Sequence, residues 1–182
     1  MPWLKRSAPA DPLAVSMSGA KLGDRLLVIG CGDPALIAAL ASKSGLTGRA
    51  CAVDASPDRV AEAARIAERE GALVETTTAP GWTLPFDGDS FDLIVIRDVP
   101  ANDRGNAVSE SRRVLRPGGR CMIIDTTARG GLGGLLARRS TDDRQGESDA
   151  ARRALEDTEF VAVRLLAERD GLLFVEGVKR NA

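Results

Sequence analysis

The sequence contains no histidine among its 182 residues. This absence excludes the Ser–His and Cys–His pairs of many hydrolases, and it removes the imidazole ligands of common metal sites. It also removes the usual general base near neutral pH. An enzyme built from this chain therefore has to work with carboxylates, lysine, backbone groups or a cofactor that brings its own reactivity.

Aromatic residues and excess positive charge are also scarce. Aromatic residues make up 3% of the chain, tyrosine is absent, and 25 basic residues face 26 acidic ones. A platform for stacking bases needs several exposed rings, and a grip on a phosphate backbone needs clustered positive charge. We therefore expect no nucleic-acid partner.

The three cysteines, Cys31, Cys51 and Cys121, are widely separated, and no C-x-x-C pair occurs. The sequence thus favours neither a zinc site nor a redox pair, and free thiols fit a reducing compartment. The first residues lack the apolar core of a signal peptide, and no apolar run approaches the roughly 20 residues of a membrane span. We expect a soluble, cytoplasmic protein with no metal and no membrane partner.

The length and the 43% hydrophobic content predict one domain over residues 1–182. Residues 1–22 contain three prolines and no sustained period, so we expect a loosely ordered segment with a short helix near residues 12–18. The rest alternates apolar runs with amphipathic stretches, which is typical of parallel strands joined by helices. Strands are expected at 25–29, 50–53, 73–77, 91–96 and 121–124.

Helix starts are marked by Asp33-Pro34 and Ser56-Pro57, each an N-cap followed by proline at the first helical position. A further helix is expected at about 102–115. After the fifth strand we expect a Gly-rich loop at 129–134 and then a highly charged stretch from 137 that leads into a helix ending at about 157. Two last strands, 160–166 and 172–178, flank an Asp-Gly turn that favours a hairpin. The predicted fold is α/β: a Rossmann-like open twisted sheet, mostly parallel, with a C-terminal antiparallel hairpin and helices on both faces.

The first predicted strand leads into Gly30-Cys31-Gly32, and Asp54 ends the second strand. Glycine lets the backbone approach a ligand closely, and a helix N-terminus beside it offers free N–H groups. A carboxylate 22 residues after the second glycine can accept both hydroxyls of a ribose. The pattern favours a nucleoside ligand over a plain tight turn with an exposed aspartate.

Four stretches in this order resemble the class I S-adenosylmethionine-dependent methyltransferases, of the small-molecule type similar to the ubiquinone/menaquinone methyltransferase group. They are LLVIGCG at 26–32, VDAS at 53–56, LPFDGDSFDL at 84–93 and SRRVLRPGG at 111–119. The closing hairpin resembles the antiparallel seventh strand of that family. The resemblance covers roughly residues 22–179 and implies methyl transfer from S-adenosylmethionine to an unidentified small molecule.

The resemblance also implies a role for individual residues. The turn at Gly30, Cys31 and Gly32 would contact the methionine half of the cofactor, and Asp54 would hold the ribose hydroxyls. The adenine would lie near the residues that follow these strands, and the methyl group near the end of the fourth: Ala55, Ser56, Gly81 and Trp82 for the adenine, Arg97 and Asp98 for the methyl group and acceptor.

Two departures from the family pattern leave other functions open. Pro34 stands where the family often has a third glycine, and Pro80 stands where an aspartate commonly contacts the adenine amino group. The alternative is an inactive methyltransferase-like domain that serves as a partner or structural subunit. A nicotinamide-dependent oxidoreductase would share the glycine turn and Asp54, but such proteins usually lack the closing hairpin.

Two strand-end carboxylates are the candidates for acid–base work. Asp98 is the predicted catalytic base, and Asp125 could join it as a base or in a metal pair, although such residues are more often solvated strand-end carboxylates. Cys31 fits packing better than nucleophilic attack. The acceptor cannot be read from the sequence, and a second subunit could complete its site, which makes a homo-oligomer an open prediction.

Overall fold

The computed structural model describes residue 10 and residues 12–127 and 141–181. In this part of the chain seven strands form one sheet in the order β3-β2-β1-β4-β5-β7-β6, with β7 antiparallel to both of its neighbours and the other pairs parallel. The strands are β1 (Arg25–Ile29), β2 (Arg49–Asp54), β3 (Glu75–Thr78), β4 (Phe91–Arg97), β5 (Leu115–Thr126), β6 (Phe160–Arg169) and β7 (Leu172–Lys179).

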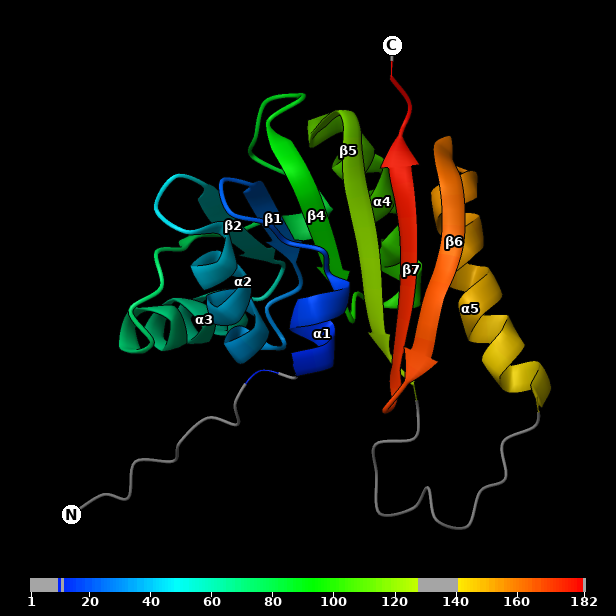
Figure 1. Ribbon diagram of the computed structural model, residues 1–182, viewed down its shortest axis with the longest axis horizontal. Helices are drawn as coiled ribbons and strands as arrows, with labels where there is room; N and C mark the ends of the chain where they lie inside the picture. Colours follow the sequence, from blue (N-terminus) through cyan, green and yellow to red (C-terminus); the bar gives the residue numbers. More distant parts are fainter. Residues whose placement is uncertain (1–9, 11, 128–140, 182) are drawn as a thin grey trace.

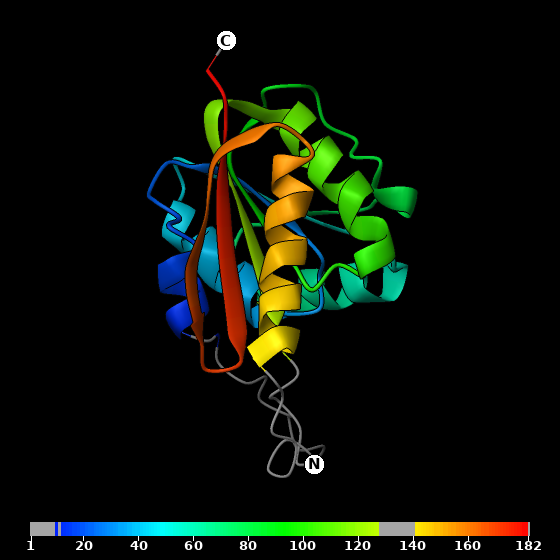
Figure 2. The ribbon, with the colours of Figure 1, turned by 90° about the vertical axis from the view of Figure 1, so that its right-hand side faces the viewer.

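Helices cover both faces of the sheet (Figures 1 and 2). One layer contains α1 (Pro12–Met17), α2 (Pro34–Ser44) and α3 (Pro57–Arg69), and the other contains α4 (Ala101–Val114) and α5 (Thr141–Glu156). A short 3-10 helix, η1 (Pro80–Trp82), follows β3. The predicted doubly covered, mostly parallel sheet is confirmed.

Burial on both faces explains the continuous apolar strands. Alternate residues of β1, Leu26 and Val28, pack with α1 and α2, while Leu27 and Ile29 pack in the cluster that includes α4 and α5. All four are at most 1% exposed. A strand with helices on both sides gains free energy from burying every side chain, so it shows no polar alternation.

The predicted helix starts are confirmed by their hydrogen bonds. The carboxylate of Asp33 accepts from the backbone N–H of Leu36 at 3.1 Å, and the hydroxyl of Ser56 accepts from the N–H of Arg59 at 3.4 Å. Each cap satisfies an N–H group that has no partner within the helix. Both caps fix a helix at the carboxyl end of a strand.

Some predicted boundaries are wrong. The third strand begins at Glu75, which pairs with Cys51, and not at Leu73, which is 74% exposed and precedes any pairing with β2. The fifth strand begins at Leu115, because this residue already pairs with Phe91 before the register shifts around Pro117-Gly118. The fifth strand is therefore six residues longer at its start than apolarity alone predicted.

The two ends of the described chain match the expectations more closely. Helix α1 occurs where a short helix was predicted, and Ala14 is 1% exposed in the core. Asp170 and Gly171 both have positive φ, 55° and 79°, as a type I′ hairpin turn requires. The Gly-rich loop predicted at 129–134 lies outside the described residues. Among the helices in the described part of the chain, none is long and apolar enough to cross a membrane.

Candidate functional site

The carboxyl ends of β1, β2, β4 and β5 meet at one edge of the sheet, where open α/β sheets bind their ligands. The turn after β1 begins with Gly30, whose φ is +97° and whose N–H donates to the carbonyl of Val53 at 2.8 Å. A Cβ on Gly30 would lie 2.2 Å from the carbonyl oxygen of Arg97. Glycine is therefore required here by the packing of β1 against β4.

Gly32 differs from Gly30 in its surroundings. A Cβ added to it would meet no described atom within 4 Å. Nothing in the described protein demands glycine at this position, so its small size leaves space beside the N-terminus of α2. That space is where a ligand could approach the backbone.

Asp54, at the end of β2, is 1% exposed and joins two segments of the site. Its Oδ2 accepts from the backbone N–H of Cys31, and its Oδ1 accepts from the N–H of Ser56, both at 2.8 Å. Arg59 lies 3.6 Å from the same carboxylate. Each carboxylate oxygen has a further lone pair, so the group can still accept from two hydroxyls. Ala55, beside it, is exposed.

The segment after β3 is tied to Asp54 through the backbone. Ala79 donates its N–H to the carbonyl of Asp54 at 2.9 Å, and Trp82 donates to the carbonyl of Ala79 at 3.1 Å. Gly81 is exposed with φ +63°, whereas the Trp82 side chain is 4% exposed within the core. The backbone of Gly81 and Trp82 is thus held near Asp54, while the indole ring packs in the interior.

Arg97 ends β4 with a side chain that is only 9% exposed. Its Nη1 lies 2.5 Å from Oδ2 of Asp98 and donates to the hydroxyl of Thr126 at 3.0 Å. Its Nε lies 3.7 Å from Oδ2 of Asp33, beyond hydrogen-bond distance, and has no hydrogen-bond partner within the described ranges. The guanidinium therefore connects the glycine turn with the end of β5.

Asp98, the predicted base, is held by neighbouring groups, although its side chain is 41% exposed. Its Oδ1 accepts from the backbone N–H of Thr126 at 2.5 Å, and its Oδ2 accepts from the Thr126 hydroxyl at 2.9 Å. Its φ of +49° is a conformation that aspartate tolerates better than most residues. With Arg97 also bound to it, this carboxylate fastens β4 to β5, and its catalytic role stays a prediction.

Asp125 has a different environment on the opposite face of β5. Its Oδ2 lies 2.7 Å from Nη2 of Arg104, in the first turn of α4, and its Oδ1 is buried without a hydrogen-bond partner in the described chain. Burial raises the pKa of Asp125 to about 6, because Arg104 only partly opposes the loss of solvation and Asp98 adds a like charge. In the sequence, the position of Asp125 at the end of a predicted strand was the signal that pointed to this pair. No sequence pattern indicated Arg104 as its partner.

The described cysteines and acidic side chains form neither a reactive thiol nor a metal site at this edge. Burial, with the charge of Asp54, raises the pKa of Cys31 to about 12, so the thiol stays protonated. Cys31, Cys51 and Cys121 are all free and buried. Within residues 12–127 and 141–181, no group of three or more Cys, Asp or Glu side chains is arranged to hold a metal ion.

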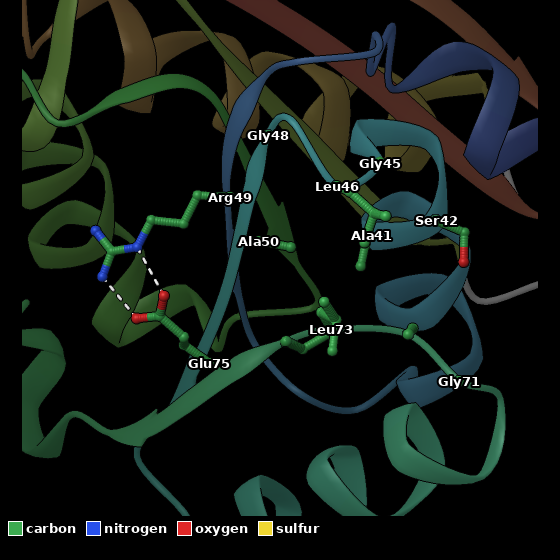
Figure 3. A pocket seen from close by; sticks show the side chains of 12 residues that line it. Ala41, Ser42, Gly45, Leu46, Gly48, Arg49, Ala50, Gly71, Leu73 and Glu75 are labelled. Carbon is green, nitrogen blue, oxygen red and sulfur yellow. Dashed lines mark hydrogen bonds and ion pairs between the residues drawn. The ribbon is translucent and has the colours of Figure 1, made fainter.

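A cavity of about 570 Å³ opens at the opposite edge of the sheet, where β2 and β3 begin (Figure 3). Arg49 and Glu75 close one side through two hydrogen bonds of 2.9 and 2.6 Å. The rest of the lining comes mainly from the end of α2, from the turn that follows it and from the segment before β3. None of the predicted site residues lines this cavity, so it is separate from the candidate site.

Comparisons with known proteins agree with this geometry. Residues 26–119 match the model of a methyltransferase domain family. The chain is 36% identical over 121 residues to the chloroplastic 2-phytyl-1,4-beta-naphthoquinone methyltransferase of Arabidopsis thaliana, covering 62% of this chain and 46% of that protein. This chain thus spans about half the length of the curated relatives it matches.

Solved structures share the fold at low sequence identity. A SAM-dependent methyltransferase from Aquifex aeolicus superposes with a TM-score of 0.72 at 20% identity, covering 93% of this chain and 94% of that one. A SAM-dependent O-methyltransferase from Thermotoga maritima gives 0.73 at 18% identity, covering 98% and 69%. At such identities the likeness describes the fold alone.

Proposed function

The chain belongs to the methyltransferase domain family, and from that premise we propose that it transfers a methyl group from S-adenosylmethionine to a small molecule. The observation that carries the proposal is Asp54, a buried carboxylate held between the glycine turn and the start of α3. Two hydroxyls on adjacent carbons match the lone pairs that this carboxylate still has free.

The residues present fit the two ends of this cofactor. Gly32 leaves open space beside the N-terminus of α2, where a polar methionine group can approach the backbone. The orphaned Nε of Arg97 faces the same turn and is a donor suited to an anionic group. Ala55 is small and exposed, and Gly81 is exposed in the segment that Ala79 joins to the backbone of Asp54, which suits a flat adenine ring.

When bound, the cofactor supplies an electrophilic methyl group on a sulfonium, so the protein needs no nucleophile of its own. The chain's own task is to hold the acceptor in line with that methyl group. The absence of histidine is compatible with this chemistry, because alignment and charge placement do not require imidazole. The buried edge between β1 and β4 keeps the two reactants on a rigid platform.

The departures at Pro34 and Pro80 bear on a second candidate function. Pro34 occupies the first position of α2, where the missing N–H would have no helical partner in any case. Pro80 brings no carboxylate toward an adenine amino group, which favours weaker recognition of the base. A domain that no longer binds cofactor and serves as a partner subunit is therefore the alternative.

Calorimetric titration of the intact chain with S-adenosylmethionine and S-adenosylhomocysteine tests the proposal. We expect both to bind, and we expect Asp54→Asn to weaken binding at least tenfold because the amide offers fewer acceptors to the ribose. Asp58→Asn is the matched control, since Asp58 is an exposed carboxylate in the first turn of α3. It should leave both affinities unchanged.

Three results would contradict the proposal or parts of it. Folded protein that binds neither compound at millimolar concentration favours the partner-subunit alternative. Asp54→Asn that binds as well as the parent removes the ribose assignment. A nicotinamide cofactor found by mass spectrometry after denaturation would identify an oxidoreductase instead.

We also propose that this is a cytoplasmic, homo-oligomeric enzyme with a small-molecule acceptor and no nucleic-acid partner. Three free, buried thiols suit a reducing compartment, and the net charge of −1 is unsuited to a phosphate backbone. Cell fractionation, light scattering and filter binding to RNA and DNA test these points separately. Secretion, a strict monomer or salt-sensitive nucleic-acid binding would each overturn the matching point.

A further inference from the structure

The pair formed by Asp125 and Arg104 lies at the same edge as the proposed cofactor site. Arg97, the last residue of β4, pairs with Ile124, so Asp125 lies one residue beyond the end of β4. The order β1-β4-β5 places the end of β5 two strands from the glycine turn, roughly 10 Å away. An acceptor that approaches the cofactor across β4 would therefore meet this pair.

The two side chains satisfy each other only in part. They share one contact of 2.7 Å, and Nη2 of Arg104 also reaches the carbonyl of Val99 at 3.5 Å. Oδ1 of Asp125 and Nε of Arg104 are both buried, and neither has a hydrogen-bond partner in the described residues. Leaving such buried atoms unpaired is unfavourable, so a ligand that pairs with them is favoured.

Asp98 differs from Asp125 in that both of its oxygens already accept a hydrogen bond. Thr126 donates to each of them, and Arg97 forms an ion pair with the group. The two strand-end carboxylates thus differ in their hydrogen bonds. Asp98 joins β4 to β5, whereas Oδ1 of Asp125 has no hydrogen-bond donor in the described residues. This contrast makes Asp125 the better candidate for contact with the reacting group.

The charged groups that face Asp125 come from α4, from α5, and from β4 and the residue that follows it. Arg104 of α4 and Arg97 of β4 favour its ionised form, while Asp98 and Glu147 of α5 oppose it, and burial opposes it most strongly. The pKa of about 6 means that the group is mainly ionised at neutral pH and is a stronger base than an ordinary carboxylate. Phenols, with pKa values near 10, are within reach of such a base, whereas aliphatic alcohols are far weaker acids.

Resting on the proposed methyl transfer, we propose that Asp125 is the catalytic base that accepts the proton of a phenolic or enolic hydroxyl of the acceptor. The O–H bond breaks and its proton goes to Oδ1 of Asp125. The freed electron pair, on oxygen or delocalised to a ring carbon, forms the new bond to the methyl carbon. The bond from that carbon to the sulfonium breaks, and its electron pair stays on sulfur. Arg104 holds Asp125 and balances the negative charge that develops on the acceptor.

Binding of two phenolic probes, phenol and 2-naphthol, to the chain saturated with S-adenosylhomocysteine tests this role. Calorimetry between pH 5 and 8 should give binding that weakens as the pH falls below about 6, because a protonated Asp125 no longer accepts the probe's hydroxyl. Asp125→Asn should lower the affinity at pH 7 at least tenfold and abolish the pH dependence. Asp125→Glu should restore the pH dependence.

Asp103→Asn is the matched control, since Asp103 is the neighbouring acidic residue in the first turn of α4. It should behave like the parent, and all variants should bind S-adenosylhomocysteine equally well, which shows that they are folded. If neither probe binds the saturated parent, or if Asp125→Asn keeps the parent's affinity and pH profile, the role of Asp125 is refuted. Failure of S-adenosylhomocysteine to bind the parent would overturn the proposed function itself and this role with it.

Discussion

The edge of the sheet that holds the candidate site has two halves, and different chemical groups form each of them. At the ends of β1 and β2, backbone N–H groups, two glycines and one carboxylate form the site, and Asp54 contacts residues 23 positions before it and 2 after it. At the ends of β4 and β5, charged side chains form the site, including the Asp98–Thr126 and Arg104–Asp125 pairs. The first half suits an invariant nucleoside, and the second can be altered by single substitutions without disturbing the turn.

The difference follows from what each half must recognise. Backbone groups have fixed positions, so a site made from them is rigid and costs little entropy to organise when it binds. Side chains can be exchanged one at a time without moving the backbone, so they are suited to define which acceptor fits, because function resides in the site and not in the fold. If this comparison is right, substitutions in the first half should damage folding or cofactor binding, and substitutions of Asp98 and Asp125 in the second should spare the cofactor.

The largest effect is expected from Gly30→Ala. The new methyl group would collide with the carbonyl of Arg97, and alanine disfavours a φ of +97°. We expect a loss of about 3 kcal/mol in the free energy of unfolding, measured by urea denaturation. Gly32→Ala, with open space around it, should lose less than about 1 kcal/mol but weaken S-adenosylhomocysteine binding at least tenfold. Equal stability of the two variants would break the distinction between a packing glycine and a ligand glycine.

A smaller effect is expected from Asp98→Ala. This change removes the acceptors for the N–H and hydroxyl of Thr126 and the partner of the buried Arg97 guanidinium. The free energy of unfolding should fall by about 1–3 kcal/mol, with affinity for S-adenosylhomocysteine within threefold of the parent. Asp98→Asn, which tolerates the positive φ, should lose less. A large loss of cofactor affinity with unchanged stability would show that Asp98 belongs to the cofactor half.

The smallest effects are expected when the pH is changed. The free energy of unfolding should respond to pH in opposite directions at Asp92, where β4 begins, and at Asp125, where β5 ends. Burial alone would raise the pKa of Asp92, but hydrogen bonds from Arg25 and Arg116 lower it to about 2. The folded state then binds fewer protons than the unfolded state, so this contribution is present above about pH 4 and disappears as the pH falls toward 2. Asp92→Asn should cost about 1–2 kcal/mol at pH 7 and almost nothing at pH 2.

Asp125 should act in the reverse direction. Because its pKa is raised to about 6, the folded state binds more protons between about pH 4 and 6, and stability falls as the pH rises through this interval. Asp125→Asn should remove that fall. Urea unfolding of the parent and both variants from pH 2 to 8 measures the two trends. Parallel pH profiles for the parent and Asp125→Asn would mean that the carboxyl of Asp125 has an ordinary pKa.

Much of the fold was predictable because its signals are local. Asp33 and Ser56 cap helices through hydrogen bonds to residues three positions later, and the Asp-Gly turn reflects the φ values that those two residues allow. Leu73 shows the limit of this reasoning. It has an apolar side chain and precedes a strand, yet only pairing with β2 decides where that strand begins.

The sequence alone determined the order of strands and helices and the position of the glycine turn and Asp54, since each depends on residues close together in the chain or on a regular period. The sequence predicted Asp98 as the base. Only the tertiary structure decided that both oxygens of Asp98 accept hydrogen bonds from Thr126, and that Asp125 pairs with Arg104 while its Oδ1 has no hydrogen-bond partner in the described residues. The register between β4 and β5 and the placement of α4 bring these distant residues together, and both result from packing over the whole sheet, which no local pattern encodes.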